Sequence, residues 1–303
     1  MWKNKHVRDL AWLISSAPML EDPGKDLLER WCTSEFCRGL FSIHSQWLSD
    51  LDDDPTELNR FLSGSEKLLL GKHYELLFEF LLKYSPHFEF RSGNIQLNRH
   101  GITHTEMDFL AQYLMESRWI HFEISCKYYL AASNSSQHDQ WIGPNGNDSL
   151  SERMRKFQKQ LNLINTTPDL PILRDMLNLE ANSMGWLKGF LFVPFRLIGN
   201  HKLPKGISSH CPVGWHMKST EIDVFIDAPA QWLILPRHEW ISPWEGNPKS
   251  LNLFSGKDLV EFVKMHFANS QKAVMVIQLD PLTEYTKEMS RGFIVHQHWP
   301  TVH

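Results

Sequence analysis

Alternating apolar and polar residues mark one stretch of this chain more clearly than any other, between residues 106 and 129. Successive side chains of a strand point to opposite faces, so the alternation over residues 119–129 predicts a strand with an apolar and a polar face. The apolar positions are Ile120, Phe122, Ile124, Cys126 and Tyr128, and the polar positions are His121, Glu123, Ser125 and Lys127. The solvated face of an ordinary antiparallel sheet gives the same pattern.

A shorter segment, residues 106–110, carries Asp108 in the same alternation as Glu106. If the two segments pair as a hairpin, Asp108 and Glu123 project from one side of the sheet. Lys127 lies on the same polar face as Glu123. We interpret this pair of carboxylates with a nearby ammonium group as the candidate active site.

Helical spacing predicts a long helix before these strands, over residues 65–84. Its apolar side chains recur three or four positions apart at Leu70, Tyr74, Leu77, Phe78 and Leu81. Glu75 and Glu79 lie one turn apart on this helix, and an ion pair with Lys83 accounts for Glu79. Glu75 has no such simple explanation and is a third acidic candidate.

Two further patterns complete the predicted core. Residues 88–91 and 94–97 predict short strands joined by a turn at Ser92 and Gly93. Ser149 and Glu152 form a capping-box pattern, which predicts a helix from near Leu150 to about Leu163. This helix carries the densest cationic patch of the chain, made by Arg153, Arg155, Lys156 and Lys159, followed by Gln160.

The chain divides into three predicted parts. Residues 1–58 form a helical segment with breaks at prolines 18, 23 and 55. Residues 59–200 form the core, which continues through a break at Pro168 and Pro171, a helical stretch and a buried strand over 185–194. Residues 201–303 form a C-terminal subdomain, with apolar segments at 221–226 and 231–236, a capped helix over 255–267 and a strand over 273–279.

Composition limits the classes of function. The 303 residues carry 42% apolar side chains and a net charge of −4, so binding to nucleic acid requires a local basic patch. The four cysteines lack the paired spacing of zinc sites, which favours a reducing, cytoplasmic location. No apolar run approaches the roughly 18 residues of a membrane span, so we expect no membrane partner. Phosphate-loop and nucleophile-elbow motifs are missing.

The predicted order of helix, strands bearing Asp108 and Glu123 with Lys127, helix and strand resembles the core of the PD-(D/E)xK nuclease superfamily. The chain also resembles a bacterial family described as domain of unknown function 1853. That resemblance rests on residues 71–75, 106–108, 121–130, 141–144, 188–192 and 235–237, with Trp240. The superfamily resemblance implies a mixed α/β fold with a restriction-endonuclease-like αβββαβ core, to which the chain adds a helical N-terminal segment and a mixed C-terminal subdomain.

The superfamily resemblance also implies roles for the candidate residues. Asp108, Glu123 and Glu75 would bind Mg²⁺ or Mn²⁺, helped by the backbone carbonyl of Ile124, and Lys127 would orient the attacking water. The basic helix, with Arg153, Arg155, Lys156, Lys159 and Gln160, would contact the phosphate backbone of DNA or RNA. The lysine departs from the superfamily pattern, since Lys127 is two positions too late. In an extended strand its Cα is roughly 13 Å from that of Glu123, against roughly 7 Å for the usual spacing.

Three functions follow from these patterns. The first is a Mg²⁺-dependent nuclease that uses Asp108, Glu123, Glu75 and Lys127. The second is a nuclease-like fold without catalysis that binds nucleic acid or protein, which the late lysine and the acidic net charge favour. The third is another kind of hydrolase based on histidine, but the 16 histidines are scattered. Their densest group, His210 and His216 with Cys211, lacks metal-ligand spacing.

Overall fold

The computed structural model describes residues 2–99, 102–166, 182–248, 251–279 and 286–300. The chain forms two compact units, each made of several segments. The first comprises residues 1–126, 153–188 and 206–210, and the second comprises 127–152, 189–205 and 211–303. Strands pair both parallel and antiparallel, so the fold is mixed α/β. The predicted division at residues 58 and 200 stays a prediction, as does the restriction-endonuclease-like core.

Helices of the first unit confirm the predicted N-terminal pattern. They are α1 (Lys5–Ser15), α2 (Ser34–Asp53), α3 (Thr56–Phe61) and α4 (Leu70–Tyr84). The Asn4 side chain caps α1 by accepting from two backbone N–H groups, and Pro55 separates α2 from α3. The α4 helix begins five residues later than predicted, because Ser65–Lys67 forms a separate 3₁₀ turn. The predicted helical stretch after Pro171 lies outside the described residues.

Three antiparallel strands follow α4: β1 (Phe88–Arg99), β2 (Ile102–Tyr113) and β3 (Arg118–Ala131). The predicted turn at Ser92 and Gly93 is wrong. Both residues belong to β1, just after a bulge, and pair with Leu110 and Phe109 of β2. A Cβ atom at Gly93 would lie 3.0 Å from the Phe109 ring. The glycine therefore makes room for an aromatic ring within the sheet instead of reversing the chain.

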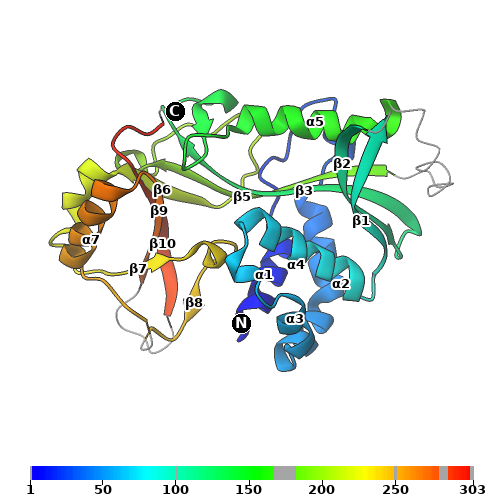
Figure 1. The fold of residues 1–303 in the computed structure, drawn as a ribbon, viewed down its shortest axis with the longest axis horizontal. Helices are drawn as coiled ribbons and strands as arrows, with labels where there is room; N and C mark the ends of the chain where they lie inside the picture. Colours follow the sequence, from blue (N-terminus) through cyan, green and yellow to red (C-terminus); the bar gives the residue numbers. More distant parts are fainter. Residues whose placement is uncertain (1, 100–101, 167–181, 249–250, 280–285, 301–303) are drawn as a thin grey trace. The chain divides into compact units, whose positions relative to one another are not determined.

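An aromatic core fixes which face of β3 meets α4. The ring of Phe78 in α4 lies 5.6 Å from Phe109, 5.2 Å from Phe122 and 5.3 Å from Trp186, measured between centroids. Trp186 belongs to β5 (Asn182–Pro194), the predicted buried strand. Because α4 covers the apolar face, the polar face of β3 points to the other side, where α5 (Leu150–Thr166) lies (Figure 1).

The second unit holds the remaining strands. They are β4 (Trp141–Ile142), β6 (Val213–Lys218), β7 (Gln231–Leu235), β8 (Glu245–Gly246), β9 (Val274–Leu279) and β10 (Thr286–Val295). The β6 strand pairs parallel with both β5 and β10, and β9 pairs antiparallel with β10 and β7. Helix α7 (Gly256–Asn269) has the predicted serine cap and packs on a core around Trp215 and Trp232. Residues 221–226 belong to a 3₁₀ segment and the turn after it.

Candidate functional site

The register of the β2–β3 hairpin brings Asp108 and Glu123 together. Phe109 pairs with Phe122, so Asp108 and Glu123 occupy the next pair of positions and project to the opposite face from the two rings. The backbone N–H of Ile124 donates a hydrogen bond of 2.8 Å to Asp108 Oδ2. This contact crosses from β3 to β2 and fixes the Asp108 carboxylate against its neighbour. The resemblance implied the carbonyl of Ile124 as a metal ligand, whereas the contact on the carboxylate is made by its N–H.

Helix α5 covers the carboxylate pair. Its capping box forms as predicted, with the Ser149 N–H donating to Glu152 and the Glu152 N–H donating to the Ser149 hydroxyl. Further along the helix, Gln160 Nε2 donates a 2.8 Å hydrogen bond to the backbone carbonyl of Glu106. Beneath the helix, the Glu123 side chain is 13% exposed and that of His121 is 0% exposed. The polar face of β3 is therefore no ordinary solvated face.

Burial dominates the electrostatics of both carboxylates. It raises the pKa of Asp108 to about 6, against the Ile124 hydrogen bond, and the charges of Glu75 and Glu106 raise it further. Burial, followed by the charge of Asp108, raises the pKa of Glu123 to about 9. The charge of Arg153 lowers both pKa values. The pair thus carries less negative charge than two exposed carboxylates would.

Two buried polar atoms at this site have no hydrogen-bond partner among the described residues: Glu123 Oε2 and His121 Nε2. They lie 3.9 Å apart. Burial lowers the pKa of His121 to about 4, so the ring is neutral and forms no ion pair with Glu123. Its other nitrogen lies 3.2 Å from Ser183 Oγ. Buried polar atoms are nearly always satisfied in proteins, so these two atoms are suited to contact a water molecule or a ligand.

The other predicted catalytic residues, Glu75 and Lys127, each form an ion pair of their own. Glu75 Oε2 lies 2.8 Å from Lys72 Nζ in an ion pair, and the charge of Glu75 raises the pKa of Asp108. Lys127 belongs to the second unit, where its Nζ lies 2.7 Å from Asp148 Oδ2. Arg153 is a cation whose charge lowers the pKa of both Asp108 and Glu123. The role of Lys127 as a water-orienting group stays a prediction.

Sequence reasoning placed Arg153 and Gln160 with the phosphate-contacting residues and missed their relation to the carboxylates. Both are half-buried, whereas Arg155, Lys156 and Lys159 are exposed. A signal existed in the sequence, because residues seven positions apart lie on one face of a helix. The capping box fixes where α5 starts, and the spacing from 153 to 160 then separates the inner polar residues from the outer ones.

Asp108 and Glu123 fit a Mg²⁺ ion better than they fit a metal with more protein ligands. No group of three or more His, Cys, Asp or Glu side chains in the described part of the chain is arranged to hold a metal. Mg²⁺ keeps most of its waters and commonly takes one or two carboxylates, so it does not require such a group. The unsatisfied Glu123 Oε2 beside Asp108 supplies hard oxygen donors of the right kind.

The fold and site define a mixed α/β protein with a helix-covered carboxylate pair on a β-hairpin. Residues 8–295 match the family described as "Domain of unknown function (DUF1853)", and the chain belongs to this family, as the sequence predicted. Searches of curated proteins and of solved structures give no match. Among the described residues, every helix is too short or too polar to cross a bilayer.

Proposed function

We propose that this protein is a phosphodiester hydrolase that depends on Mg²⁺ or Mn²⁺ and acts on nucleic acid. The observation that carries the proposal is the buried, unsatisfied Glu123 Oε2 next to Asp108. Protonation of Glu123 relieves the repulsion in the free protein, and a divalent cation would replace that proton and also contact the unsatisfied oxygen. Asp108 and Glu123 would hold the ion.

The metal, when bound, would activate a water molecule and offset charge on the phosphate. The residues of the chain would prepare this site in three ways. The Ile124 N–H holds one oxygen of Asp108 in place. Gln160 hydrogen-bonds Glu123 and links α5 to the Glu106 backbone, so the helix position and the carboxylate position are coupled. Arg153 adds positive charge beside the pair, where an anionic substrate would approach.

The exposed face of α5 supports nucleic acid as the substrate. Arg155, Lys156 and Lys159 are exposed on the helix whose inner face covers the carboxylates. A polyanion attracted to these cations would meet the helix that closes the site. Lys127 is held by Asp148, so the proposal does not depend on that lysine.

Nuclease assays on single- and double-stranded DNA and RNA test the proposal, with Mg²⁺, Mn²⁺ or excess chelator. We expect metal-dependent cleavage that falls by about 100-fold or more in D108N and in E123Q. E116Q is the matched control, because Glu116 lies on the turn of the same hairpin, is 52% exposed and pairs with Arg118. Undiminished cleavage in D108N, or no cleavage of any substrate by the wild type, would overturn the assignment.

A second function is favoured by the Lys127–Asp148 ion pair and by the lack of a three-ligand metal group among the described residues. In this alternative the fold binds nucleic acid or protein without cleaving it. The two functions separate in one measurement, which is binding of labelled DNA and RNA with chelator present. The alternative predicts equal affinity for wild type and D108N, with no cleavage after metal is added.

A further inference from the structure

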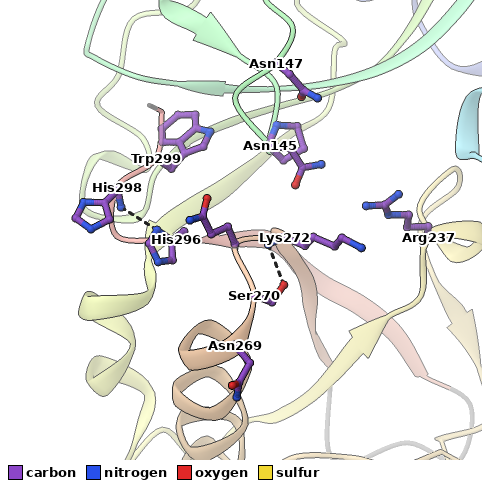
Figure 2. Close-up of a pocket in the computed structure, with 11 residues that line it drawn as sticks. Asn145, Asn147, Arg237, Asn269, Ser270, Lys272, His296, His298 and Trp299 are labelled. Atoms are coloured by element: carbon purple, nitrogen blue, oxygen red, sulfur yellow. Dashed lines mark hydrogen bonds between the residues drawn. The ribbon is translucent and has the colours of Figure 1, made fainter. Parts of the chain in front are cut away.

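The second unit contains a cavity of about 720 Å³ that the carboxylate site does not use. Three segments frame it: the loop around Asn145, the residues that follow α7, and the residues that follow β10 (Figure 2). Arg237 lines the cavity from a fourth segment. A cavity of this size matches the pockets that bind small molecules of nucleotide size.

The charged side chains that line the cavity are all cationic. Arg237 and Lys272 line it, and none of its eleven lining residues is Asp or Glu. Figure 2 shows the Lys272 side chain extending toward Arg237. No ion pair between described residues engages either side chain. Two cations directed at one another, with no carboxylate among the lining residues, produce a positive potential that attracts an anion into the space between them.

Three neutral polar side chains of the cavity are oriented as donors, whereas Asn269 Nδ2 donates to the Met265 carbonyl and leaves its oxygen as an acceptor. Asn145 Oδ1 accepts from the Ala273 N–H at 3.2 Å, which leaves the amide NH₂ to donate. Ser270 Oγ accepts from the Lys272 N–H at 3.1 Å, which leaves its hydroxyl hydrogen. His296 Nδ1 accepts from the His298 N–H at 3.3 Å, so the neutral ring carries its hydrogen on Nε2. Each of these three side chains accepts from a backbone N–H and keeps a hydrogen to donate to a ligand.

An aromatic wall completes the cavity. The indole of Trp299 lines it and is held in place by a 3.1 Å hydrogen bond from its Nε1 to the Gly143 carbonyl. The His216 ring packs 5.2 Å from it on the protein side. A ligand here therefore meets cations, neutral donors and a fixed aromatic ring in one space. That combination is suited to a phosphate group carried on an organic ring system.

We propose that this cavity binds a phosphate monoester of nucleotide size, with the phosphate between Arg237 and Lys272. The phosphate offsets the repulsion between the two cations, and the donors of Asn145, Ser270 and His296 contact the oxygens or the sugar. A free nucleoside monophosphate and the 5′-phosphorylated end of a short strand share this chemistry. The proposal does not rest on the Asp108–Glu123 site.

Calorimetric titration of the full-length protein tests the proposal with adenosine monophosphate, adenosine, inorganic phosphate, and a trinucleotide with and without its 5′-phosphate. We expect the monophosphate to bind about tenfold or more tightly than adenosine, because adenosine cannot form the charged hydrogen bonds. Equal affinity for the monophosphate and for the 5′-phosphorylated trinucleotide would place the terminal phosphate as the recognised group. A preference for the mononucleotide would identify the small molecule as the ligand.

The double variant R237Q/K272Q provides the decisive comparison. We expect it to weaken binding of the monophosphate by about tenfold or more, while its melting temperature stays unchanged because both side chains are exposed. K202Q/K257Q removes the same charge from exposed positions outside the cavity and should bind like the wild type. D108N should also bind like the wild type, which separates this proposal from the nuclease proposal. Unchanged binding in R237Q/K272Q, or no binding of any phosphate monoester, would refute it.

Discussion

Arg291 and Glu123 are both nearly buried ionisable residues, but their surroundings differ. Arg291, 3% exposed, contacts Glu288 through Nε and Nη2 at 2.8 and 2.6 Å. It also donates to the carbonyls of Trp240 and Ser242, and its guanidinium lies 4.3 Å from the centroid of the Phe190 ring. Glu123, by contrast, keeps a buried oxygen without a hydrogen-bond partner among the described residues.

The difference separates a charged side chain whose hydrogen bonds hold the fold together from a carboxyl group that we propose binds a metal ion. A buried ion that is fully hydrogen-bonded is expensive to break, because removal of one partner leaves the other charge buried and alone. A buried carboxylate with an unsatisfied oxygen already carries that cost in the folded state. Substitution of the two residues should therefore affect stability in opposite ways.

Arg291→Met should cause the largest change. The substitution removes the countercharge of Glu288 and the guanidinium donors to the carbonyls of Trp240 and Ser242, so we expect the free energy of unfolding to fall by about 3–5 kcal/mol. Urea unfolding followed by tryptophan fluorescence measures it. Arg196→Met is the matched control, because Arg196 is 75% exposed and pairs with Glu221 at 3.5 Å, and it should change stability by less than about 0.5 kcal/mol. Similar losses of stability in the two variants would show that the buried Arg291 stabilises the fold no more than the exposed Arg196 does.

Cys37, a third buried ionisable residue, lies in the first unit and tests how a buried charge with close partners contributes to stability as pH changes. Cys37 Sγ lies 3.2 Å from Cys32 Sγ and 2.9 Å from Lys188 Nζ, and Lys188 also donates to the Ser16 carbonyl. The hydrogen bond from Cys32 and the charge of Lys188 lower the pKa of Cys37 to about 6. The thiolate is thus present in the folded protein at a pH where the unfolded chain still holds the proton.

Stability from Cys37 should therefore increase as pH rises from about 6 toward 9, by at most about 1.4 kcal/mol per pH unit, and should be lost as pH falls through 6. Denaturant unfolding of wild type and C37A at pH 6, 7 and 8 measures the difference between the two slopes. C211A is the control, because Cys211 is buried in the second unit and burial raises its pKa to about 12. Equal slopes in wild type and C37A would show that Cys37 stays protonated.

The sequence predicted those parts of the fold that depend on local pattern. The alternation in β3, the helical spacing in α4 and the capping box of α5 were sufficient, because each is set by residues within a few positions. The turn at Gly93 failed because glycine signals both a turn and a close packing contact, and the Phe109 ring decides between them. The β6 and β10 strands were missed, since they pair with each other across a large separation in the chain.

The candidate site likewise combines features set by nearby residues with features set by tertiary contacts. The juxtaposition of Asp108 and Glu123 follows from one hairpin, and the sequence predicted it. The covering helix, by contrast, packs through tertiary contacts, so the full burial of His121 and the unsatisfied Glu123 oxygen were outside local reasoning. The ion pair of Lys127 with Asp148 joins residues 21 positions apart across a loop, and strand alternation alone does not predict it.

Glu123→Gln tests the second residue of the comparison with Arg291. In metal-free buffer at pH 7 we expect its free energy of unfolding to be unchanged or higher by about 1 kcal/mol, because the Glu123 carboxyl, with a pKa of about 9, is already protonated at this pH and a neutral amide fills the same space. Mg²⁺ should raise the melting temperature of the wild type and leave that of E123Q unchanged. E116Q should respond to Mg²⁺ like the wild type. A loss of several kcal/mol in E123Q would make Glu123 a structural residue like Arg291.

The smallest effect on stability should come from the outer face of α5. R155Q/K156Q/K159Q alters exposed side chains, so the free energy of unfolding should stay within about 0.5 kcal/mol, whereas affinity for nucleic acid should fall. The slope of log affinity against log salt should decrease by roughly one for each phosphate that the variant no longer neutralises. K67Q/K202Q/K257Q removes equal charge from exposed positions elsewhere and should keep the wild-type slope. If both triple variants bind nucleic acid equally weakly, net charge attracts the polyanion and α5 has no special role. If the α5 variant alone binds more weakly, the helix that covers the carboxylates also faces the substrate.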